Sequence, residues 1–150
     1  MQDSKSVSRI LQGITIVALI GFLDALYLFY GELQGNLGCL INGGVFNCKT
    51  VNFSQYAKIF NIPVSLLGAL YYCAVTILVF LIIKYPRHVW LKLLLPTLAL
   101  VGALFSIYLT VLELFVIKSL CEFCLLSAIC SWIIAILVFY LKKKVYFSFF

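Results

Sequence analysis

Two cysteines three residues apart, Cys121 and Cys124, are the residues of this sequence that most plainly predict chemistry. They stand where a long apolar run begins, so we expect them in the first turn of a helix, where side chains three positions apart share a face and can form a disulfide. Pairs with this spacing serve in redox reactions, in metal binding and as plain structure. The amino end of a helix favours a thiolate, which favours the redox interpretation.

The two thiols of this pair are expected to face different surroundings. Cys121 lies at the helix end, whereas Cys124 lies about 4.5 Å deeper along the helix axis and faces the apolar interior. This polarity suits a relay that passes two electrons from a thiol in water to a hydrophobic acceptor. A stabilising disulfide is the alternative, although closing a loop of three residues adds little stability.

Cys39 and Cys48 form a second candidate pair. Cys39 lies in a glycine-rich stretch, residues 35–44, which should be flexible. Because thiol exchange requires a thiolate to reach a disulfide sulfur, a mobile pair beside a fixed pair could act as a shuttle. A static loop disulfide is one alternative. A zinc site built from the four thiols is another, but the eight-residue spacer differs from the short spacers of most structural zinc motifs, and we assign no metal site.

The composition is that of an integral membrane protein. Of 150 residues, 65% are hydrophobic and only 11% are charged, and the mean hydropathy is +1.15, far outside the range of soluble domains. The net charge of +6 does not indicate nucleic acid binding, because the cations flank apolar runs. We expect one all-α domain over residues 1–150, a bundle of four membrane-spanning helices at about residues 9–30, 63–83, 91–117 and 120–141.

Three basic clusters predict the topology. They are Lys5 with Arg9, then Lys84, Arg87 and Lys92, then Lys142, Lys143 and Lys144. By the positive-inside rule these segments are cytoplasmic, so both termini lie inside and the two cysteine pairs lie on the outer face. An oxidising compartment is where thiol pairs persist as disulfides.

A short amphipathic helix is expected in the outer segment. Phe53, Tyr56, Ala57 and Phe60 repeat at helical spacing, and Asn52 with Gln55 three residues later resembles a capping box. This helix would lie across the mouth of the bundle.

Five further polar or reactive residues fall in or near the spans. Asp24 and Glu113 are candidates for proton transfer, since acids within a membrane are often functional, although both are close enough to the interface to be hydrated. Cys73 and Cys130 are expected to be small packing residues. His88 lies among basic residues in a predicted cytoplasmic turn and is expected to be solvated.

Taken together, these motifs resemble the vitamin K epoxide reductase family, and its bacterial and archaeal members most. The matching elements are two loop cysteines, a serine six residues after the second, a proline-to-glycine segment, and a C-x-x-C that opens the last span. They are Cys39, Cys48, Ser54, residues 62–68, and Cys121 with Cys124.

The resemblance implies a four-helix bundle around a quinone, capped by the outer loop and its short helix. Cys124 would attack the quinone, Cys121 would exchange with Cys48, and Cys39 would take electrons from a reduced partner. Ser54 matches a serine near the quinone head group. We also expect the quinone site to be lined by Val51, Leu67 and Leu109.

Two positions depart from the animal enzymes of this family. Their asparagine and tyrosine, which hydrogen bond vitamin K, are matched here by Val64 and Ala128, so epoxide reduction by the animal route is not expected. Many bacterial relatives carry a fused thioredoxin-like domain, and this sequence shows none, which implies a separate DsbA-like partner with a thioredoxin fold.

The sequence therefore predicts a membrane thiol oxidase. It would pass electrons from a reduced thioredoxin-fold protein through the two cysteine pairs to a membrane quinone and so support disulfide bond formation. The alternatives are a reductase of vitamin K quinone or epoxide, and a non-enzymatic membrane protein whose cysteines are structural or bind metal.

Overall fold

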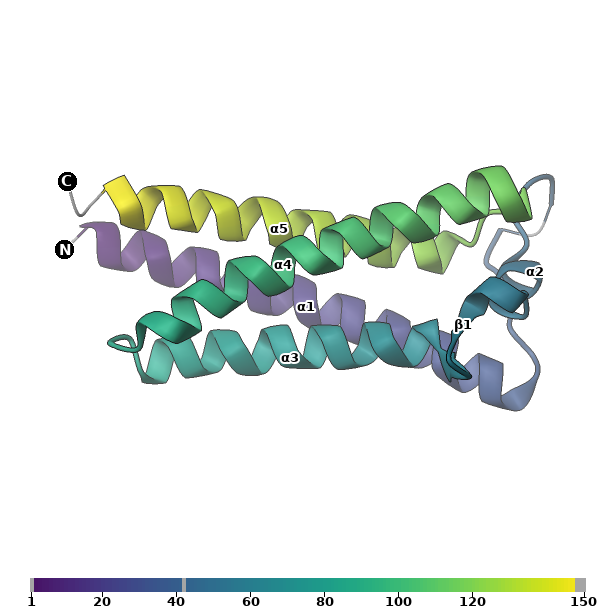
Figure 1. Ribbon diagram of the computed structural model, residues 1–150, viewed down its shortest axis with the longest axis horizontal. Coiled ribbons are helices and arrows are strands. Elements are labelled where there is room, and N and C mark those ends of the chain that lie inside the picture. Colours follow the sequence, from purple (N-terminus) through teal and green to yellow (C-terminus); the bar gives the residue numbers. More distant parts are fainter. Residues whose placement is uncertain (1, 42, 148–150) are drawn as a thin grey trace.

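Four long helices form the body of the protein in the computed structural model, which describes residues 2–41 and 43–147. They are α1 (Gln2–Gln34), α3 (Val64–Lys84), α4 (Val89–Val111), which the π-helix η2 (Leu112–Ile117) extends, and α5 (Glu122–Phe147). Figure 1 shows them side by side. Within the described residues, four helices are long and apolar enough to cross a membrane. The predicted all-α membrane bundle is confirmed, and the chain is a multi-pass membrane protein.

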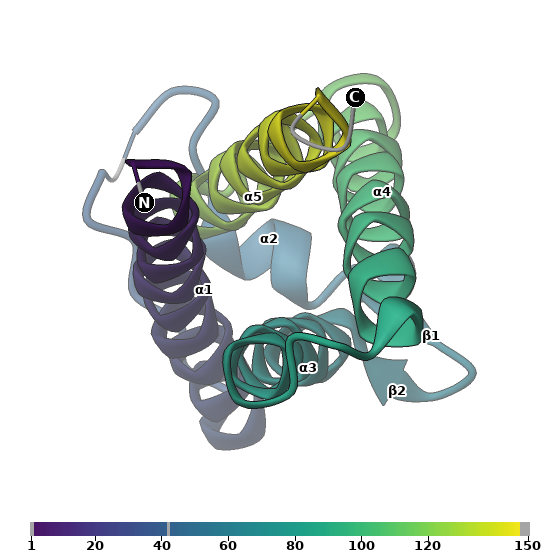
Figure 2. The same ribbon diagram turned by 90° about the vertical axis from the view of Figure 1, so that its left-hand side faces the viewer.

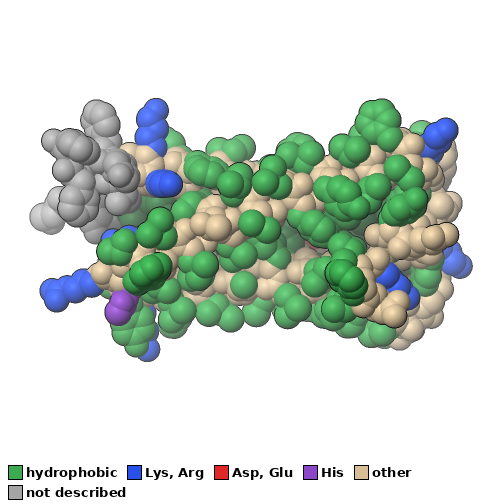
Figure 3. All heavy atoms as spheres, viewed as in Figure 1, with side chains coloured by type: hydrophobic (Ala, Val, Ile, Leu, Met, Phe, Trp, Pro, Cys, Tyr) green, Lys and Arg blue, Asp and Glu red, His purple; other side chains and the backbone are tan. Residues whose placement is uncertain are grey.

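The bundle is held together by packing of small and branched side chains. Ile14, Ala18, Val75, Val79 and Ile134 are fully buried between the helices. Large apolar side chains also point outward, and Figure 3 shows them covering the long flank of the molecule, with lysine and arginine side chains at its two ends. Because lipid tails are as apolar as these outward side chains, van der Waals contact between the helices stabilises the bundle.

The two ends of the bundle differ. The chain termini and the turn between α3 and α4 lie at one end, and the long connection from α1 to α3 lies at the other (Figure 1). All three basic clusters of the sequence therefore gather at the end that holds the termini. The cysteine pairs lie at the opposite end.

The connection from α1 to α3 contains the predicted short helix, but at a different place. Helix α2 (Cys48–Asn52) is followed by the 3₁₀-helix η1 (Gln55–Ala57) and by the antiparallel strands β1 (Lys58–Ile59) and β2 (Ile62–Pro63). In Figure 2, seen along the bundle, α2 crosses the far end between the long helices. A short helix in this loop is thus confirmed.

The predicted helix over residues 53–60 and its capping box are wrong. Phe60 and Asn61 have φ angles of 50° and 65°, in the left-handed region, which places them in a tight turn rather than a helix. Phe60 is 96% exposed. The helix cap is Asn47, whose side chain accepts a hydrogen bond from the Thr50 N–H. Eight residues of helical spacing were too short a pattern to exclude a turn.

Candidate functional site

Four cysteines lie together at the end of the bundle opposite the termini. Cys39 and Cys48 form a disulfide with a Cα–Cα distance of 5.8 Å, and Cys121 and Cys124 are free thiols. All four belong to one buried cluster with apolar side chains of α1 and α2. The structure therefore brings together the two pairs that the sequence singled out. We call Cys39 and Cys48, which form a disulfide, the outer pair, and Cys121 and Cys124, which are free thiols, the inner pair.

Backbone pairing docks the loop beside the inner pair. The Asn47 N–H donates to the Leu120 carbonyl at 3.0 Å, and the Leu120 N–H donates to the Val45 carbonyl at 2.9 Å. Since Cys48 follows Asn47 and Cys121 follows Leu120, this short parallel pairing sets the two cysteines next to each other. Both are completely buried.

Asn52 connects the same two cysteines through its side chain. Its amide donates to the Cys48 carbonyl at 3.0 Å and to the Cys121 sulfur at 3.5 Å. Only 6% of Asn52 is exposed. The spacing of Asn52 and Gln55 predicted a helix cap instead, and the only sequence signal of the observed role was a polar side chain four positions after Cys48.

Cys121 is placed to ionise. It precedes the first residue of α5, and its sulfur accepts the Cys124 backbone N–H at 3.3 Å, in the manner of a helix cap. The pKa of the Cys121 thiol is lowered, chiefly because the Cys124 thiol hydrogen bonds to it, with smaller contributions from the Cys124 N–H and the Asn52 amide; burial opposes the shift. The thiolate, which is the nucleophile in exchange, is thereby favoured.

Replacing Asn52 with alanine is expected to shift the deprotonation of Cys121 to higher pH. A hydrogen bond to the thiolate stabilises the charged form and lowers the pKa, so its loss raises the pKa again. Thiolate ultraviolet absorbance measured against pH, after subtraction of the Cys121→Ser spectrum, reports the midpoint. Asn36→Ala, in an exposed loop position, should leave it unchanged. An equal midpoint for Asn52→Ala and the parent would show that the amide does not act on the thiolate.

Glu122, between the two cysteines of the inner pair, holds the loop that contains Cys39. One carboxylate oxygen accepts a hydrogen bond from the Leu40 N–H, and both oxygens accept from the Ile41 N–H, at 3.3 and 3.2 Å. These hydrogen bonds connect the loop to α5 directly after Cys39. Nothing in the sequence predicted this contact.

The Glu122→Ala variant is expected to loosen that loop. Loss of the carboxylate removes charge-assisted bonds at an exposed position, and amide hydrogen exchange at Leu40 and Ile41 should become about fivefold faster. Hydrogen exchange followed by mass spectrometry measures this rate. Glu122→Gln keeps an acceptor oxygen and should give a smaller increase. Unchanged exchange in the alanine variant would mean that other contacts hold the loop.

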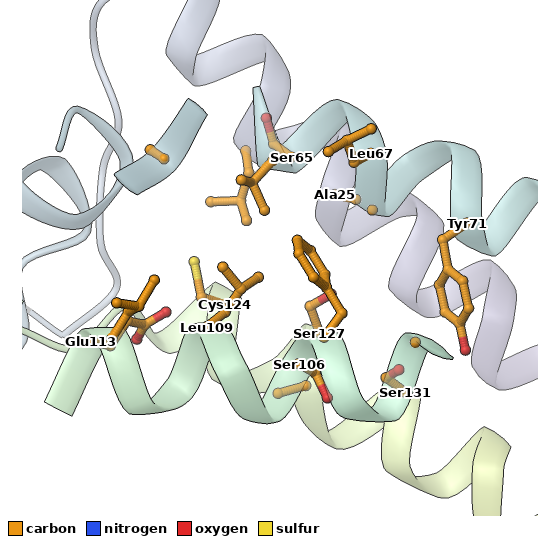
Figure 4. A pocket seen from close by; sticks show the side chains of 18 of the residues that line it. Ala25, Ser65, Leu67, Tyr71, Ser106, Leu109, Glu113, Cys124, Ser127 and Ser131 are labelled. Atoms are coloured by element: carbon orange, nitrogen blue, oxygen red, sulfur yellow. The ribbon is translucent and has the colours of Figure 1, made fainter. Parts of the chain in front are cut away.

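A cavity opens from the inner pair into the bundle. It has a volume of about 520 Å³, within the range of small-molecule sites, and its wall is mostly apolar. Figure 4 shows the Cys124 sulfur pointing into it. The wall also contains all four residues that the sequence analysis named around a ligand, namely Val51, Ser54, Leu67 and Leu109. The Ser54 hydroxyl donates to the Val51 carbonyl at 2.7 Å.

The sequence profile of the vitamin K epoxide reductase family matches residues 13–139. The chain belongs to this family. Its members are quinone-reducing thiol oxidoreductases, which agrees with two cysteine pairs beside an apolar cavity. A search of curated proteins found no significant match.

The cavity of this vitamin K epoxide reductase family protein suits a quinone. A flat apolar ring with polar oxygens requires an apolar wall with a few hydrogen-bonding groups, and the wall has that composition. Two hydroxyl oxygens in it, of Tyr71 and Ser131, are buried and have no hydrogen-bond partner other than each other among the described residues. Since unpartnered buried hydroxyls are costly, they fit a ligand that brings its own polar atoms.

The two acids singled out in the spans occupy different places. Glu113, on η2, is 4% exposed, lines the cavity, and accepts the Cys121 N–H at 3.1 Å. Figure 4 shows its carboxylate at the Cys124 end of the cavity. Asp24 is 7% exposed but is not part of the cavity wall. Glu113 therefore lies beside the thiols at the Cys124 end of the cavity, whereas Asp24 lies outside its wall.

The remaining cysteines lie apart from the site. Cys130 is buried in the main core of the bundle, as a packing residue should be, whereas Cys73 is exposed on the flank of α3. Among the described residues, potential metal-binding atoms gather within 4.8 Å only at Cys39, Cys48 and Glu122. There the two sulfur atoms are bonded to each other and the carboxylate accepts loop N–H groups.

Proposed function

We propose that this protein is a membrane thiol oxidase that passes electrons from a reduced thioredoxin-fold protein to a membrane quinone and so supports disulfide bond formation. The observation that supports this function best is a continuous arrangement: a disulfide whose Cys39 is partly exposed, a thiol pair next to its buried Cys48, and a cavity beyond, with Cys124 in its wall.

Electrons would enter at Cys39. It is partly exposed, whereas Cys48 is completely buried, so an external dithiol reaches the Cys39 sulfur more easily. One thiolate of the partner attacks the Cys39 sulfur and displaces Cys48, which forms a mixed disulfide. The partner's second thiolate then displaces Cys39, so that the partner is oxidised and both loop cysteines are thiols.

Transfer between the pairs would run through Cys48 and Cys121. The Cys48 thiolate attacks Cys121 of an oxidised inner pair, and Cys124 leaves as a thiolate. Cys39 then attacks Cys48, which restores the outer disulfide and frees Cys121. The inner pair has gained two electrons, and the resulting state, with an outer disulfide and two inner thiols, is the one seen in the structure.

The inner pair would deliver these electrons in the cavity. A bound quinone supplies an acceptor for two electrons and two protons. Cys124 faces the cavity, Cys121 closes the disulfide with it, and the Glu113 carboxyl is the titratable group in the wall that is suited to hold a proton there. The buried apolar wall excludes water from the thiolate.

Quinone reduction is favoured over epoxide reduction. The two positions where animal enzymes place an asparagine and a tyrosine are Val64 and Ala128, and both line the cavity. Neither side chain can donate a hydrogen bond. The cavity therefore lacks at those positions the groups by which the animal enzymes hold vitamin K.

The charge distribution supports an orientation with both termini in the cytoplasm. All three basic clusters lie at the end of the bundle that holds the termini, which the positive-inside rule assigns to the cytoplasm. The cysteine pairs would then face the outside of a prokaryotic plasma membrane, where a separate thioredoxin-fold, DsbA-like protein is the proposed electron donor. Membrane lipid would surround the apolar flanks.

The function is tested by quinone-coupled oxidation of such a donor. Purified protein in detergent should oxidise a reduced DsbA-like protein only when quinone is present, with one quinone reduced per disulfide formed. Quinone absorbance and free donor thiols are followed together. Oxidation of the donor that does not depend on quinone, or no oxidation at all, would contradict the proposal.

A further inference from the structure

The cavity contains two hydroxyl groups that the cysteine chemistry does not use. They belong to Tyr71 of α3 and Ser131 of α5, which are close enough to interact with each other, and neither has another hydrogen-bond partner in the described part of the chain. Figure 4 shows both side chains at the end of the cavity away from Cys124 and Glu113. Because a buried, unpartnered hydroxyl costs free energy, two of them at one end point to a ligand with a polar atom there.

Neighbouring hydroxyls are satisfied by the protein itself. Ser106, also in the cavity wall, donates to the Ala103 carbonyl at 2.8 Å, and Tyr72 donates to the Ser127 carbonyl at 2.6 Å. Serines in helices commonly bond to their own backbone in this way. Ser131, only 3% exposed, does not. Among these four wall hydroxyls, only those of Tyr71 and Ser131 therefore lack a backbone acceptor.

Packing fixes the position of the Tyr71 ring. The ring lies against Gly102 of α4, where the Cβ of any other residue would overlap its atoms. It also meets the Tyr72 ring edge-on, at a centroid distance of 5.0 Å. The hydroxyl is thus held in place before a ligand arrives, which lowers the entropy cost of binding.

We propose that Tyr71 and Ser131 hydrogen bond a carbonyl oxygen of the quinone, at the end of the cavity opposite Cys124. This inference rests on the proposed function. Ser131 follows Cys124 by two helical turns on the same face of α5, about 10.5 Å along the axis, which leaves room for a quinone ring between them. Both hydroxyls are donors and a quinone carbonyl is an acceptor, so the pair would fix the orientation of the ring.

Binding of two matched probes tests the proposal without turnover. Menadione is a naphthoquinone, and methylnaphthalene has the same rings without the carbonyl oxygens. In a Cys124→Ala background, Tyr71→Phe and Ser131→Ala should each weaken menadione binding about fivefold. Methylnaphthalene binding should not change, since these variants remove only hydroxyl groups.

Two control variants keep the cavity chemistry intact. Tyr108→Phe alters an exposed tyrosine on α4, and Thr97→Ala alters an exposed residue of the same helix whose hydroxyl already bonds to the Leu93 carbonyl; neither residue lines the cavity, and neither change should alter menadione affinity. Equal menadione affinity in Tyr71→Phe, Ser131→Ala and the parent would overturn the inference, because the hydroxyls would then hold only water. Equal weakening for both probes would also overturn it. No menadione binding by the parent would overturn the proposed function itself, and this inference with it.

Discussion

Replacing Cys124 with alanine is expected to abolish quinone reduction, with a loss of about a thousandfold or more, as when other enzymes lose a nucleophile. Cys124 is the only cysteine of the described cavity wall. Without its thiol, the inner pair cannot close a disulfide, so two electrons cannot leave the protein together. Steady-state quinone reduction with a reduced donor measures the effect.

Cys130→Ala is the matched control for this variant. It removes a thiol from the same helix two turns deeper, in the main core. We expect it to keep near-parental turnover, with a modest loss of thermal stability from the lost packing. If Cys124→Ala turned over quinone as fast as Cys130→Ala, Cys124 would not be the residue that reduces the quinone.

Replacing Cys39 with alanine is expected to trap a disulfide between Cys48 and Cys121. Cys48 can still attack the inner disulfide, because backbone pairing and Asn52 hold it beside Cys121. No outer thiol then remains to displace Cys121, so the mixed disulfide should become the dominant species. Mass spectrometry of peptides from alkylated protein identifies the bridge.

Two comparisons make this trapping result specific. Cys73→Ala, an exposed thiol on the flank of α3, should not trap any bridge. The Asn52→Ala change, added to Cys39→Ala, should slow formation of the bridge because the Cys121 sulfur and the Cys48 backbone lose the side chain that contacts both. Finding only the Cys121–Cys124 disulfide in Cys39→Ala would contradict the proposed order of exchange.

The four-helix bundle was predictable because the sequence features that specify it are local along the chain. Apolar runs of membrane length, bounded by lysine and arginine, specify helices wherever the lipid offers no other hydrogen-bond partners. The proximity of Cys121 and Cys124 was also predictable, since both lie within one helical turn. These features depend on residues that are close along the chain.

The loop that covers the site was predicted less well, because its structure depends on distant contacts. Asn52 meets the Cys121 sulfur across 69 positions, and Glu122 meets the Leu40 N–H across 82. Neither contact has a sequence pattern. The apolar residues of 53–60 have helical spacing, but the backbone is left-handed at Phe60 and Asn61, so this segment ends in a turn and not in a helix.

The residues of the cavity wall also divide into those that the sequence predicted and those that it did not. The sequence predicted that Val51, Ser54, Leu67 and Leu109 line a quinone site, and all four lie in the cavity wall, but it did not single out Tyr71 and Ser131. Polar side chains within apolar spans are a signal of function, and Ser131 could have been noticed on the face of α5 that holds Cys124. Its lack of a partner, however, is visible only in three dimensions.

The thiols of Cys121 and Cys124 are proposed to reduce a quinone. The most direct test mixes fully reduced, purified protein with menadione under anaerobic conditions, without any donor, and measures quinone absorbance and free thiols in the same sample. We predict the loss of two thiols for each quinone reduced, with the Cys121–Cys124 disulfide among the products. Quinone that stays oxidised while all six thiols of the protein remain free would contradict this mechanism.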